Sequence, residues 1–252
     1  MIHSEIVIIT PVYDDTESFY QLAQKIEDIY SENVTIVVVE DGSLNDIINL
    51  ENCPIKINIH VLRLKRNVGH QKAISVGLNY VVDKILETTK VVIMDSDGED
   101  RPESIQELLK DLDSNLIDIT VSSRKSRVES LQFKLFYQIY RFLFQFFTGY
   151  KISFGNFMAM KSKTIRRLLG YTELSTHIAG TVILSKCRTK SISIDRGPRY
   201  AGQSKMNFSG LVLHGLKALM IFSDYVLVRL GLASLLFIVI IGLVILATVL
   251  LK

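Results

Sequence analysis

The sequence contains very little cysteine: only Cys53 and Cys187 in a chain of 252 residues. The two lie far apart, without the close spacing of zinc ligands, which argues against a disulfide-stapled secreted domain and a cysteine-based metal site. Long apolar runs are also missing near the N-terminus, where Ile6–Ile9 is far too short for a signal peptide. We therefore expect reduced thiols in a protein that faces the cytosol.

Acidic residues are scarce in the second half of the chain. Residues 124–252 carry 19 Lys and Arg against 4 Asp and Glu, a net charge of +15, whereas residues 1–123 carry 10 against 22, a net charge of −12. The net charge of +3 for the whole chain hides this division. The opposite signs indicate that the two halves meet different partners.

The basic half ends in a segment that lacks charge altogether. Residues 230–251 form an uncharged apolar run, which as a helix measures about 33 Å and is long enough to cross the hydrocarbon core of a bilayer. The alternative is a buried helix of a soluble protein, which an uninterrupted run of this length disfavours. Lys205, Lys217 and Arg229 precede the run, so the positive-inside rule predicts that the preceding domain lies on the cytoplasmic face of the cell (inner) membrane. A second span beyond Lys252 stays open.

Two segments before this run have the composition of membrane-surface helices. Leu131–Tyr150 combines nine aromatic residues with Lys134 and Arg141, a density that could stack single-stranded nucleic acid. Its apolar residues dominate and an apolar span follows, which favours a helix on the membrane surface and no nucleic-acid partner. Phe208–Tyr225 predicts a second such helix. We expect four parts: a first part at 1–128, a membrane-proximal part with an interfacial helix at 129–206, an amphipathic juxtamembrane helix at 207–229 and a transmembrane helix at 230–251.

The first half of the chain alternates between strand-like and helix-like patterns. Short β-branched runs predict strands, and the stretches between them predict helices. Such alternation is typical of an α/β fold with a mostly parallel sheet, helices on both faces and ligands at the carboxyl ends of the strands. The predicted strands are 5–10, 34–39, 57–64, 91–94 and 117–122, and the predicted helices are 16–30, 69–82 and 102–112.

A cluster of carboxylates follows directly after the strand at 91–94. Like charges crowded at a strand end repel one another unless a cation compensates them. Hard oxygen ligands on a short loop suit Mg²⁺ or Mn²⁺, held together with phosphate oxygens. The alternative is a solvated acidic turn before a helix that starts at Pro102. The carboxylates are Asp95, Asp97, Glu99 and Asp100.

Four motifs in this order resemble family 2 glycosyltransferases of the GT-A fold: Thr10–Tyr13, Glu40–Ser43, Arg66–Gln71 and Asp95–Asp97. The branch that the chain resembles is the polyprenyl-phosphate glycosyltransferases, relatives of dolichyl-phosphate mannose synthase. The segment 199–205 favours this branch, because it is similar to the family's loop before the membrane helices. The chain departs from the pattern at Asp14-Asp15, where Asn-Glu is common, and at Glu99, where Gln is common.

The resemblance implies that residues 1–128 bind the nucleotide-sugar and that residues 129–206 bind the acceptor, and it implies roles for individual residues. Asp95 and Asp97, with Glu99, would hold Mg²⁺ or Mn²⁺. Arginines would bind the acceptor phosphate through their bidentate fork, and a helical turn directly after Ser123 would bring two of them to one face. The implied nucleotide-sugar residues are Pro11, Tyr13, Asp15, Asp41, Lys72 and Ser96, the acceptor-phosphate residues are Arg124, Arg127, Arg199, Ser204 and Lys205, and the catalytic set is Asp95, Asp97, Arg124 and Arg127.

The implied reaction is inverting transfer of a sugar from a nucleotide-sugar to polyprenyl phosphate at a membrane. A UDP-hexose is the first choice of donor and GDP-mannose the second. A lipid phosphate is largely dianionic at neutral pH, so it needs no general base. Two alternatives remain: a haloacid-dehalogenase-type phosphatase with Asp95 as nucleophile, and a non-catalytic nucleotide-binding membrane protein. The sequence leaves the sugar, the lipid length and self-association open.

Overall fold

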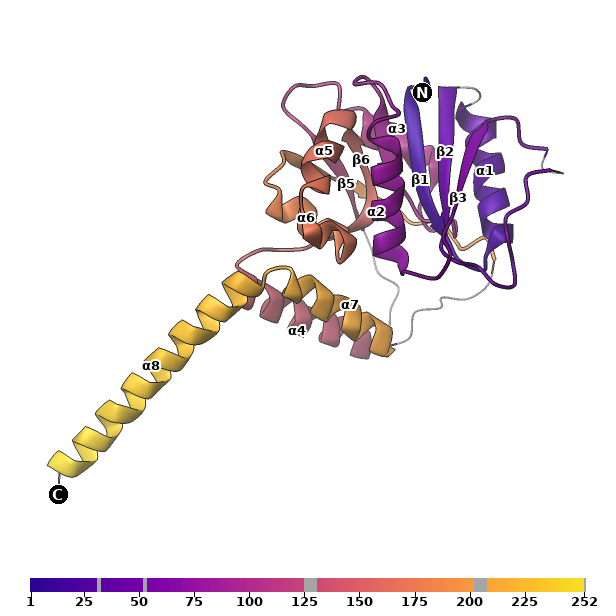
Figure 1. The fold of residues 1–252 in the computed structure, drawn as a ribbon. Coiled ribbons are helices and arrows are strands. Elements are labelled where there is room, and N and C mark those ends of the chain that lie inside the picture. Colours follow the sequence, from indigo (N-terminus) through magenta and orange to yellow (C-terminus); the bar gives the residue numbers. More distant parts are fainter. Residues whose placement is uncertain (31–32, 52–53, 125–130, 202–207, 252) are drawn as a thin grey trace. The chain divides into compact units, whose positions relative to one another are not determined.

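The structure is a computed structural model that describes residues 1–30, 33–51, 54–124, 131–201 and 208–251. The chain divides into two compact units (Figure 1). The first consists of Met1–Val128 and Ser153–Asn207, and the second of Glu129–Ile152 and Phe208–Lys252.

The first unit is built on a seven-stranded sheet with the order β3-β2-β1-β4-β6-β5-β7. β6 runs antiparallel to its neighbours β4 and β5, and every other pair is parallel. The predicted α/β class with a mostly parallel sheet is therefore confirmed. The strands are β1 (Ile6–Val12), β2 (Val34–Glu40), β3 (Asn58–Arg63), β4 (Lys90–Ile93), β5 (Ile119–Arg124), β6 (Phe154–Lys161) and β7 (Thr189–Ile194).

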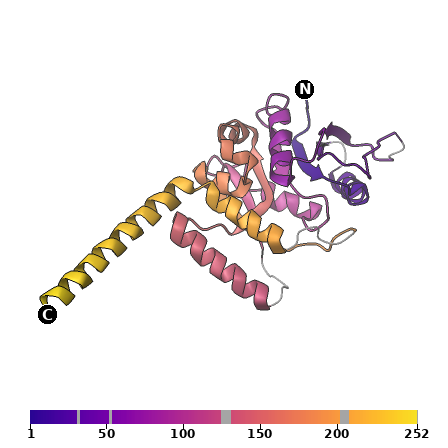
Figure 2. The ribbon, with the colours of Figure 1, turned by 60° about the horizontal axis from the view of Figure 1, so that its bottom comes forward.

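Helices cover both faces of this sheet (Figures 1 and 2). Side chains alternate between the faces of a strand, so Val7 and Ile9 of β1 join one core while Ile6 and Ile8 join the other. Both cores are closed to water, and each buried Ile or Leu contributes about 1.5–3 kcal/mol. The first core includes α2 (His70–Val81), α5 (Ser162–Leu169) and α6 (Ile178–Leu184), and the second includes α1 (Thr16–Tyr30) and α3 (Ile105–Leu109).

Helix α2 approaches the sheet closely at Gly77. A Cβ added there would lie 2.5 Å from Cγ2 of Ile9 and 3.1 Å from Cγ2 of Val39. A glycine inside a helix costs about 1 kcal/mol, which the close packing offsets here. The approach seats α2 directly on β1 and β2, so its first residue, His70, lies near the carboxyl ends of the central strands.

The region between 150 and 200 contributes elements that the sequence patterns did not predict. β6 enters between β4 and β5, and β7 forms the edge of the sheet beyond β5. Strand β7 is largely exposed, so it lacks the apolar run by which buried strands are recognised. The predicted helix at 102–112 is shorter than expected, with a 3₁₀ turn at Pro102–Ser104 followed by α3.

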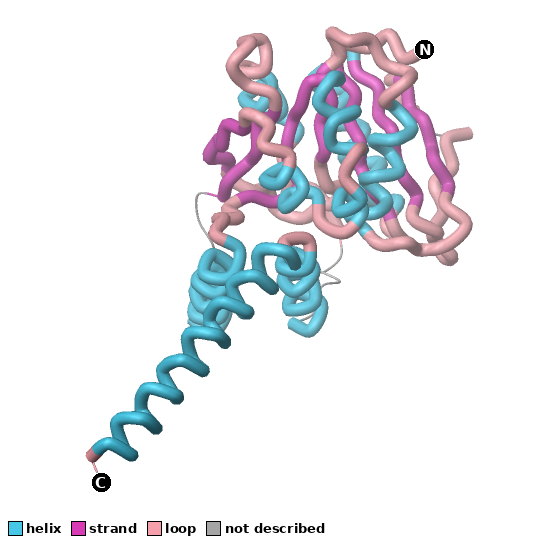
Figure 3. Tube along the Cα trace, turned by 60° about the vertical axis from the view of Figure 1, so that its left-hand side comes forward, coloured by secondary structure: helices cyan, strands magenta, loops and turns pink. Residues whose placement is uncertain are grey.

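The second unit consists of α4 (Leu131–Thr148), α7 (Phe208–Met220) and α8 (Ser223–Leu250), drawn in cyan in Figure 3. Phe144 is buried and meets Phe222 edge to face, with ring centroids 5.5 Å apart. Phe142 and Phe146 stack on each other on the outside of α4 and are 67% and 57% exposed. Aromatic residues of α4 therefore serve both the contact with its neighbours and an exposed surface.

Helix α8 is long and apolar enough to cross a membrane by its length and composition. It spans 28 residues, has a mean hydropathy of 3.0 over its most apolar stretch, and buries none of that stretch within the protein. The helix begins at Ser223, ahead of the predicted start at Leu230.

Candidate active site

The acidic loop after β4, residues 95–100, is held in shape by its own carboxylates. Asp100 is buried, and its Oδ2 accepts a hydrogen bond from the backbone N–H of Asp95 at 2.9 Å. Oδ1 of Asp97 accepts one from the N–H of Glu99 at 3.0 Å. Gly98 between them has φ +91°, a conformation that glycine adopts without strain. The loop is therefore an ordered turn whose remaining carboxylate oxygens are available to cations.

A second segment, residues 195–200, is hydrogen-bonded to the acidic loop. The N–H of Gly197 donates to the carbonyl of Glu99 at 3.0 Å, and the N–H of Tyr200 donates to the carbonyl of Asp97 at 2.8 Å. A Cβ added at Gly98 would lie 2.7 Å from Cδ1 of Tyr200. The two segments, far apart in sequence, thus form one layered structure in which only glycine fits at position 98.

Two arginines of this segment neutralise the acidic loop. Nη2 of Arg199 lies 2.5 Å from Oδ2 of Asp97, and its Nε lies 3.1 Å from Oε1 of Glu99. Arg196 pairs with Oε2 of Glu99. The resemblance assigned Arg199 to the acceptor phosphate and gave Arg196 no role. Its position three residues before the segment 199–205 was the only available signal.

The charges of the loop shift the pKa values of its carboxyls. Burial, together with the neighbouring Asp95 carboxylate, raises the pKa of Asp97 above its usual range, and Arg199 and Arg196 oppose this rise. Burial also disfavours the ionised form of Asp95, but His70, Arg196 and Arg199 outweigh it and lower the pKa of that carboxyl. Ionisation is therefore favoured at Asp95 and disfavoured at Asp97.

Asp95 provides an observation that bears on a metal ion. Its side chain is 31% exposed, yet its Oδ1 atom is buried and has no hydrogen-bond partner in the described part of the chain. Nε2 of His70 lies 3.1 Å from this oxygen without the alignment of a hydrogen bond. An orphaned carboxylate oxygen beside Asp97 and Glu99 is a donor set that fits Mg²⁺ or Mn²⁺. With the arginines in place, no group of three acidic, His or Cys side chains has metal-ligand geometry among the described residues.

Asp41, at the end of β2, is engaged with the backbone before α2. Its Oδ1 accepts from the N–H of Val68 at 2.7 Å and its Oδ2 from the N–H of Gly69 at 2.9 Å. Burial raises the pKa of Asp41, and these two hydrogen bonds oppose the rise. Each oxygen retains a lone pair for a ligand. Asp41 therefore positions the Asn67–Gly69 turn, and its predicted contact with a nucleotide stays a prediction.

The end of β1 lies beside the acidic loop. Ser96 is buried, and its hydroxyl is 3.5 Å from the carbonyl oxygen of Pro11. Asp15 is near enough to Asp97 for its charge to raise the pKa of that carboxyl. Tyr13 is 38% exposed, and Lys72 is exposed on the first turn of α2. The structure therefore brings Pro11, Asp15, Ser96, Asp95 and Asp97 together.

Asp14, which sequence analysis passed over in favour of Asp15, organises a neighbouring loop. Its Oδ1 accepts hydrogen bonds from the N–H groups of Leu44 and Asn45, each at 3.0 Å. These bonds, the one from Asn45 foremost, lower the pKa of Asp14. Asp14 adopts φ 45°, a left-handed conformation that Asp tolerates better than most residues. The carboxylate of Asp14 is therefore engaged in hydrogen bonds to the backbone of this loop.

Several predicted acceptor residues are not described. Arg127, Ser204 and Lys205 lie outside the described residues. Arg124 is the last residue of β5 and pairs with Ile194 of β7. The turn expected directly after Ser123 is therefore wrong at position 124, because β7, which the sequence patterns did not predict, extends the pairing by one residue.

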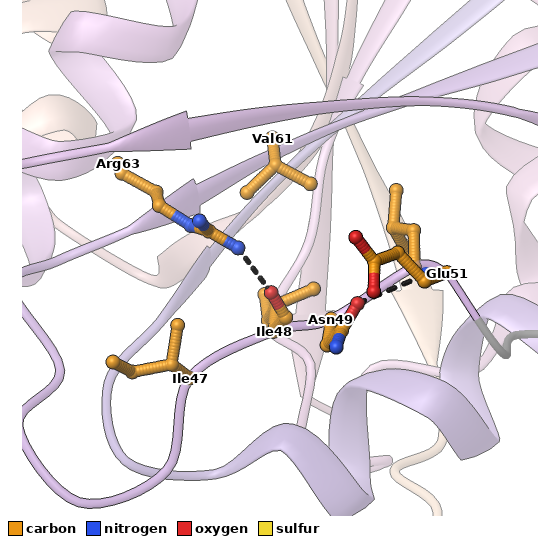
Figure 4. A pocket seen from close by; sticks show the side chains of 7 residues that line it. Ile47, Ile48, Asn49, Glu51, Val61 and Arg63 are labelled. Atoms are coloured by element: carbon orange, nitrogen blue, oxygen red, sulfur yellow. Dashed lines mark hydrogen bonds between the residues drawn. The ribbon is translucent and has the colours of Figure 1, made fainter.

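A separate hollow of about 750 Å³ lies beside the edge strand β3 (Figure 4). Arg63 faces it and donates to the carbonyl of Ile48, and its Nε lies 3.0 Å from Oε2 of Glu40. None of the predicted donor-site residues lines this hollow, so it is distinct from the acidic loop.

Comparisons with known proteins agree with this arrangement. Residues 7–176 match Glycosyl transferase family 2. The chain is 28% identical over 216 residues to the uncharacterized glycosyltransferase sll0501 of Synechocystis sp., covering 81% of this chain and 65% of that protein. It is 25% identical over 213 residues to the uncharacterized glycosyltransferase YkcC of Bacillus subtilis, covering 81% and 64%. The chain thus spans just under two thirds of these relatives.

Among solved structures, glucosyl-3-phosphoglycerate synthase from Mycobacterium tuberculosis, in complex with Mn²⁺, UDP and glucosyl-3-phosphoglycerate, has a TM-score of 0.62. The alignment covers 90% of this chain and 80% of that one at 14% identity, a likeness that shows the fold alone. The sequence match covers more than half of the chain and shows its family. The chain belongs to glycosyl transferase family 2.

Proposed function

We propose that this protein is a membrane-anchored, inverting glycosyltransferase that transfers a sugar from a nucleotide-sugar to polyprenyl phosphate. The observation that carries the proposal is the meeting of three strand ends in a family 2 chain. Asp41 follows β2, Ser96 contacts the end of β1, and Asp95 and Asp97 follow β4. Ligands of parallel α/β sheets bind at this edge.

The donor side of the proposal rests on the acidic loop. Asp95 and Asp97, with Glu99, would hold Mg²⁺ or Mn²⁺, which would neutralise negative charge that develops on the leaving diphosphate. The M. tuberculosis synthase of similar fold was crystallised with Mn²⁺ and UDP-glucose, which supports a divalent ion and a UDP-hexose as the first donor to test, with GDP-mannose second. Asp41, Pro11, Tyr13, Asp15, Lys72 and Ser96 are the residues that we assign to the nucleotide-sugar.

The acceptor side rests on charge and on the second unit. The guanidinium of Arg199 forms ion pairs with two carboxylates of the acidic loop. When these carboxylates take a metal ion, Arg199 would exchange them for phosphate oxygens, which match its planar fork. Helix α8 would anchor the protein in the inner membrane, with the first unit on the cytoplasmic face. We assign Arg124, Arg127, Ser204 and Lys205 to the same phosphate.

The reaction needs few catalytic side chains. The dianionic lipid phosphate would attack the anomeric carbon, breaking its bond to the nucleoside diphosphate in a single displacement that inverts the centre. The acceptor carries no proton that must be removed, so no general base is required. The family match and the GT-A fold favour this transfer over a phosphatase with Asp95 as nucleophile.

A direct assay tests the proposal. The full-length protein in detergent is incubated with polyprenyl phosphate, Mn²⁺ and radiolabelled UDP-glucose or GDP-mannose, and lipid-extractable label and free phosphate are measured together. We expect metal-dependent label in the lipid fraction. Phosphate release without labelled lipid would instead support the phosphatase, and neither product with any donor would contradict transfer to polyprenyl phosphate.

A further inference from the structure

We propose that His70 is a positioning residue for Asp95, and that Asn156 and Gln71 hold the ring of His70 in place. The inference rests on the proposed function, because it assigns Asp95 to the metal and donor diphosphate. It concerns three polar side chains from α2 and β6, those of His70, Gln71 and Asn156, to which no individual role has been assigned.

The three side chains form a continuous chain of contacts that ends on Asp95. Oε1 of Gln71 accepts from the N–H of Ile178 at 2.7 Å. Nε2 of Gln71 donates to Oδ1 of Asn156 at 3.1 Å. Nδ2 of Asn156 lies 3.0 Å from Nε2 of His70, and that nitrogen lies 3.1 Å from Oδ1 of Asp95. The chain therefore runs from the first residue of α6 to the acidic loop.

The direction of these hydrogen bonds follows from their first member. A backbone N–H can only donate, so the Gln71 atom that faces Ile178 must be its oxygen. The amide nitrogen of Gln71 then faces Asn156, whose oxygen accepts, and the amide nitrogen of Asn156 is left to face His70. The orientation of both amides, usually a choice between two flips, is thereby decided. Nδ2 of Asn156 therefore faces Nε2 of His70 and fixes the position of the ring.

This arrangement explains the orphaned oxygen of Asp95. Asn156 fixes the ring beside Oδ1 of Asp95, and Nε2 is not aligned for a hydrogen bond to that oxygen. The oxygen is buried and without a hydrogen-bond partner among the described residues, a state that costs free energy until a cation arrives. His70 thus limits where the carboxylate can turn and leaves one oxygen lone pair for a ligand.

The backbone around His70 is equally constrained. Both oxygens of Asp41 bind the N–H groups of Val68 and Gly69, directly before the helix. Gly69 has φ +90°, which places His70 at the start of α2 by a turn that glycine makes without strain. His70 is consequently held at its backbone by Asp41 and at its ring by Asn156.

Binding of Mn²⁺ with UDP to the full-length protein tests the inference without relying on turnover. Free Mn²⁺ is measured by electron paramagnetic resonance for wild type, His70→Ala, Asn156→Ala, the double variant and His70→Gln. Residues behind a metal ligand typically change metal affinity tenfold to a hundredfold, so we expect each Ala variant to weaken Mn²⁺ binding by about tenfold. The double variant should be no weaker than His70→Ala, because Asn156 acts through His70. His70→Gln, which can still face both neighbours, should recover part of the loss.

A matched control is His60→Ala. His60 also contacts α2 through a single hydrogen bond, Nδ1 to the hydroxyl of Tyr80 at 3.0 Å, but it lies on the edge strand β3. It should bind Mn²⁺ and UDP as wild type does. In the transfer assay, the His70 variants should raise the apparent KM for the donor and the metal while the KM for polyprenyl phosphate stays unchanged.

The outcomes separate this inference from the proposed function. If the wild-type protein binds Mn²⁺ with UDP and His70→Ala binds them equally well, the inference is overturned and the proposed function stands. Full additivity in the double variant would also overturn it, because the two side chains would then act independently. Absence of any Mn²⁺ and UDP binding by the folded wild type would overturn the metal-dependent donor site, and the inference with it.

Discussion

Arg199 lies against Asp97, with Nη2 2.5 Å from Oδ2. The pair joins a residue that sequence analysis placed at the acceptor phosphate to one that it placed at the metal. A guanidinium and a divalent cation are both attracted to the charge of this carboxylate, so we expect the two roles to be linked by competition. Entry of a cation at Asp97 should therefore weaken its pairing with Arg199, and loss of Arg199 should make Asp97 easier to reach.

Because of this competition, substitutions of Arg199 test both the metal site and the acceptor site. Arg199→Ala should bind Mn²⁺ more tightly than wild type in the absence of nucleotide, because a competing cation is gone. Arg199→Lys keeps the charge and loses the fork, so its apparent affinity for polyprenyl phosphate should fall by tenfold to a hundredfold, about 1.5–3 kcal/mol. Titration calorimetry and the transfer assay measure the two effects. Arg166→Lys, whose partner is the exposed Asp83, is the control. A large loss of nucleoside-diphosphate affinity in Arg199→Lys would contradict the acceptor role.

Asp97→Asn should abolish transfer and leave the fold intact, because an amide is a poorer ligand for a divalent ion than a carboxylate. Asp95→Asn should weaken donor binding as well. Asp83→Asn removes a surface carboxylate that pairs with Arg166 and should retain full activity. Transfer is measured over a range of Mn²⁺ concentrations, with circular dichroism as the check on folding. Full activity of Asp97→Asn in chelator would rule out the proposed metal site.

Gly98→Ala should disturb the acidic loop more than a methyl group ordinarily does. The residue has φ +91°, and the new Cβ would lie 2.7 Å from the ring of Tyr200. Strain of this kind costs about 1–3 kcal/mol, so we expect a lower Tm and weaker donor binding together. Gly170→Ala, where the new Cβ would make an ordinary contact at 3.4 Å, should change neither. A Gly98→Ala protein with wild-type Tm and donor affinity would show that the loop readily moves away from Tyr200.

Deletion of Leu230–Lys252 tests the membrane anchor. The shortened protein should leave the membrane fraction in part and keep a salt-sensitive attachment through α4, whose Phe142 and Phe146 are exposed. Co-sedimentation with anionic liposomes at low and high salt measures this attachment. Phe142→Asp with Phe146→Asp in the shortened protein should remove it. If the shortened protein does not co-sediment with anionic liposomes at low salt, α4 does not bind the membrane surface.

Asp118 links the starts of β5 and β7 and predicts a pH dependence of stability. Its carboxylate accepts from Nε and Nη2 of Arg188 at 2.9 and 2.7 Å, and this pairing lowers its pKa to about 2. A lowered folded-state pKa contributes stability that is present above the unfolded value near 4 and lost as the pH falls toward 2. Asp118→Asn should therefore lower the Tm at pH 7, and the difference from wild type should shrink between about pH 4 and 2. Equal differences at pH 7 and pH 2.5 would contradict the ionic origin.

The first half of the fold could be read from the sequence because its signals are local. β1 and β2 are buried along their whole length, so each contains a run of four apolar residues, Ile6–Ile9 and Ile36–Val39. The acidic loop was predicted for the same reason: a carboxylate cluster that directly follows such a run has to lie at the carboxyl edge of the sheet. The apolar composition of α8 likewise needs no partner to be recognised.

The second half of the sheet could not be read in this way. β7 is exposed at the sheet edge and lacks an apolar run, and β6 is recognisable only through the strands on either side of it. Without these two strands, the sequence could not show that Arg124 remains in β5 or that residues 195–200 return to the acidic loop. Both facts depend on pairings between segments more than 60 residues apart.

The sequence by itself determined the chemistry that is available at the strand ends: carboxylates, arginines and an uncharged membrane-length helix. Which of them meet was decided by tertiary structure alone. Arg199 reaches Asp97 across 102 residues, and Asn156 reaches His70 across 86. No local propensity encodes such distances, because they depend on where the antiparallel strand β6 enters the sheet and how closely α2 packs on β1.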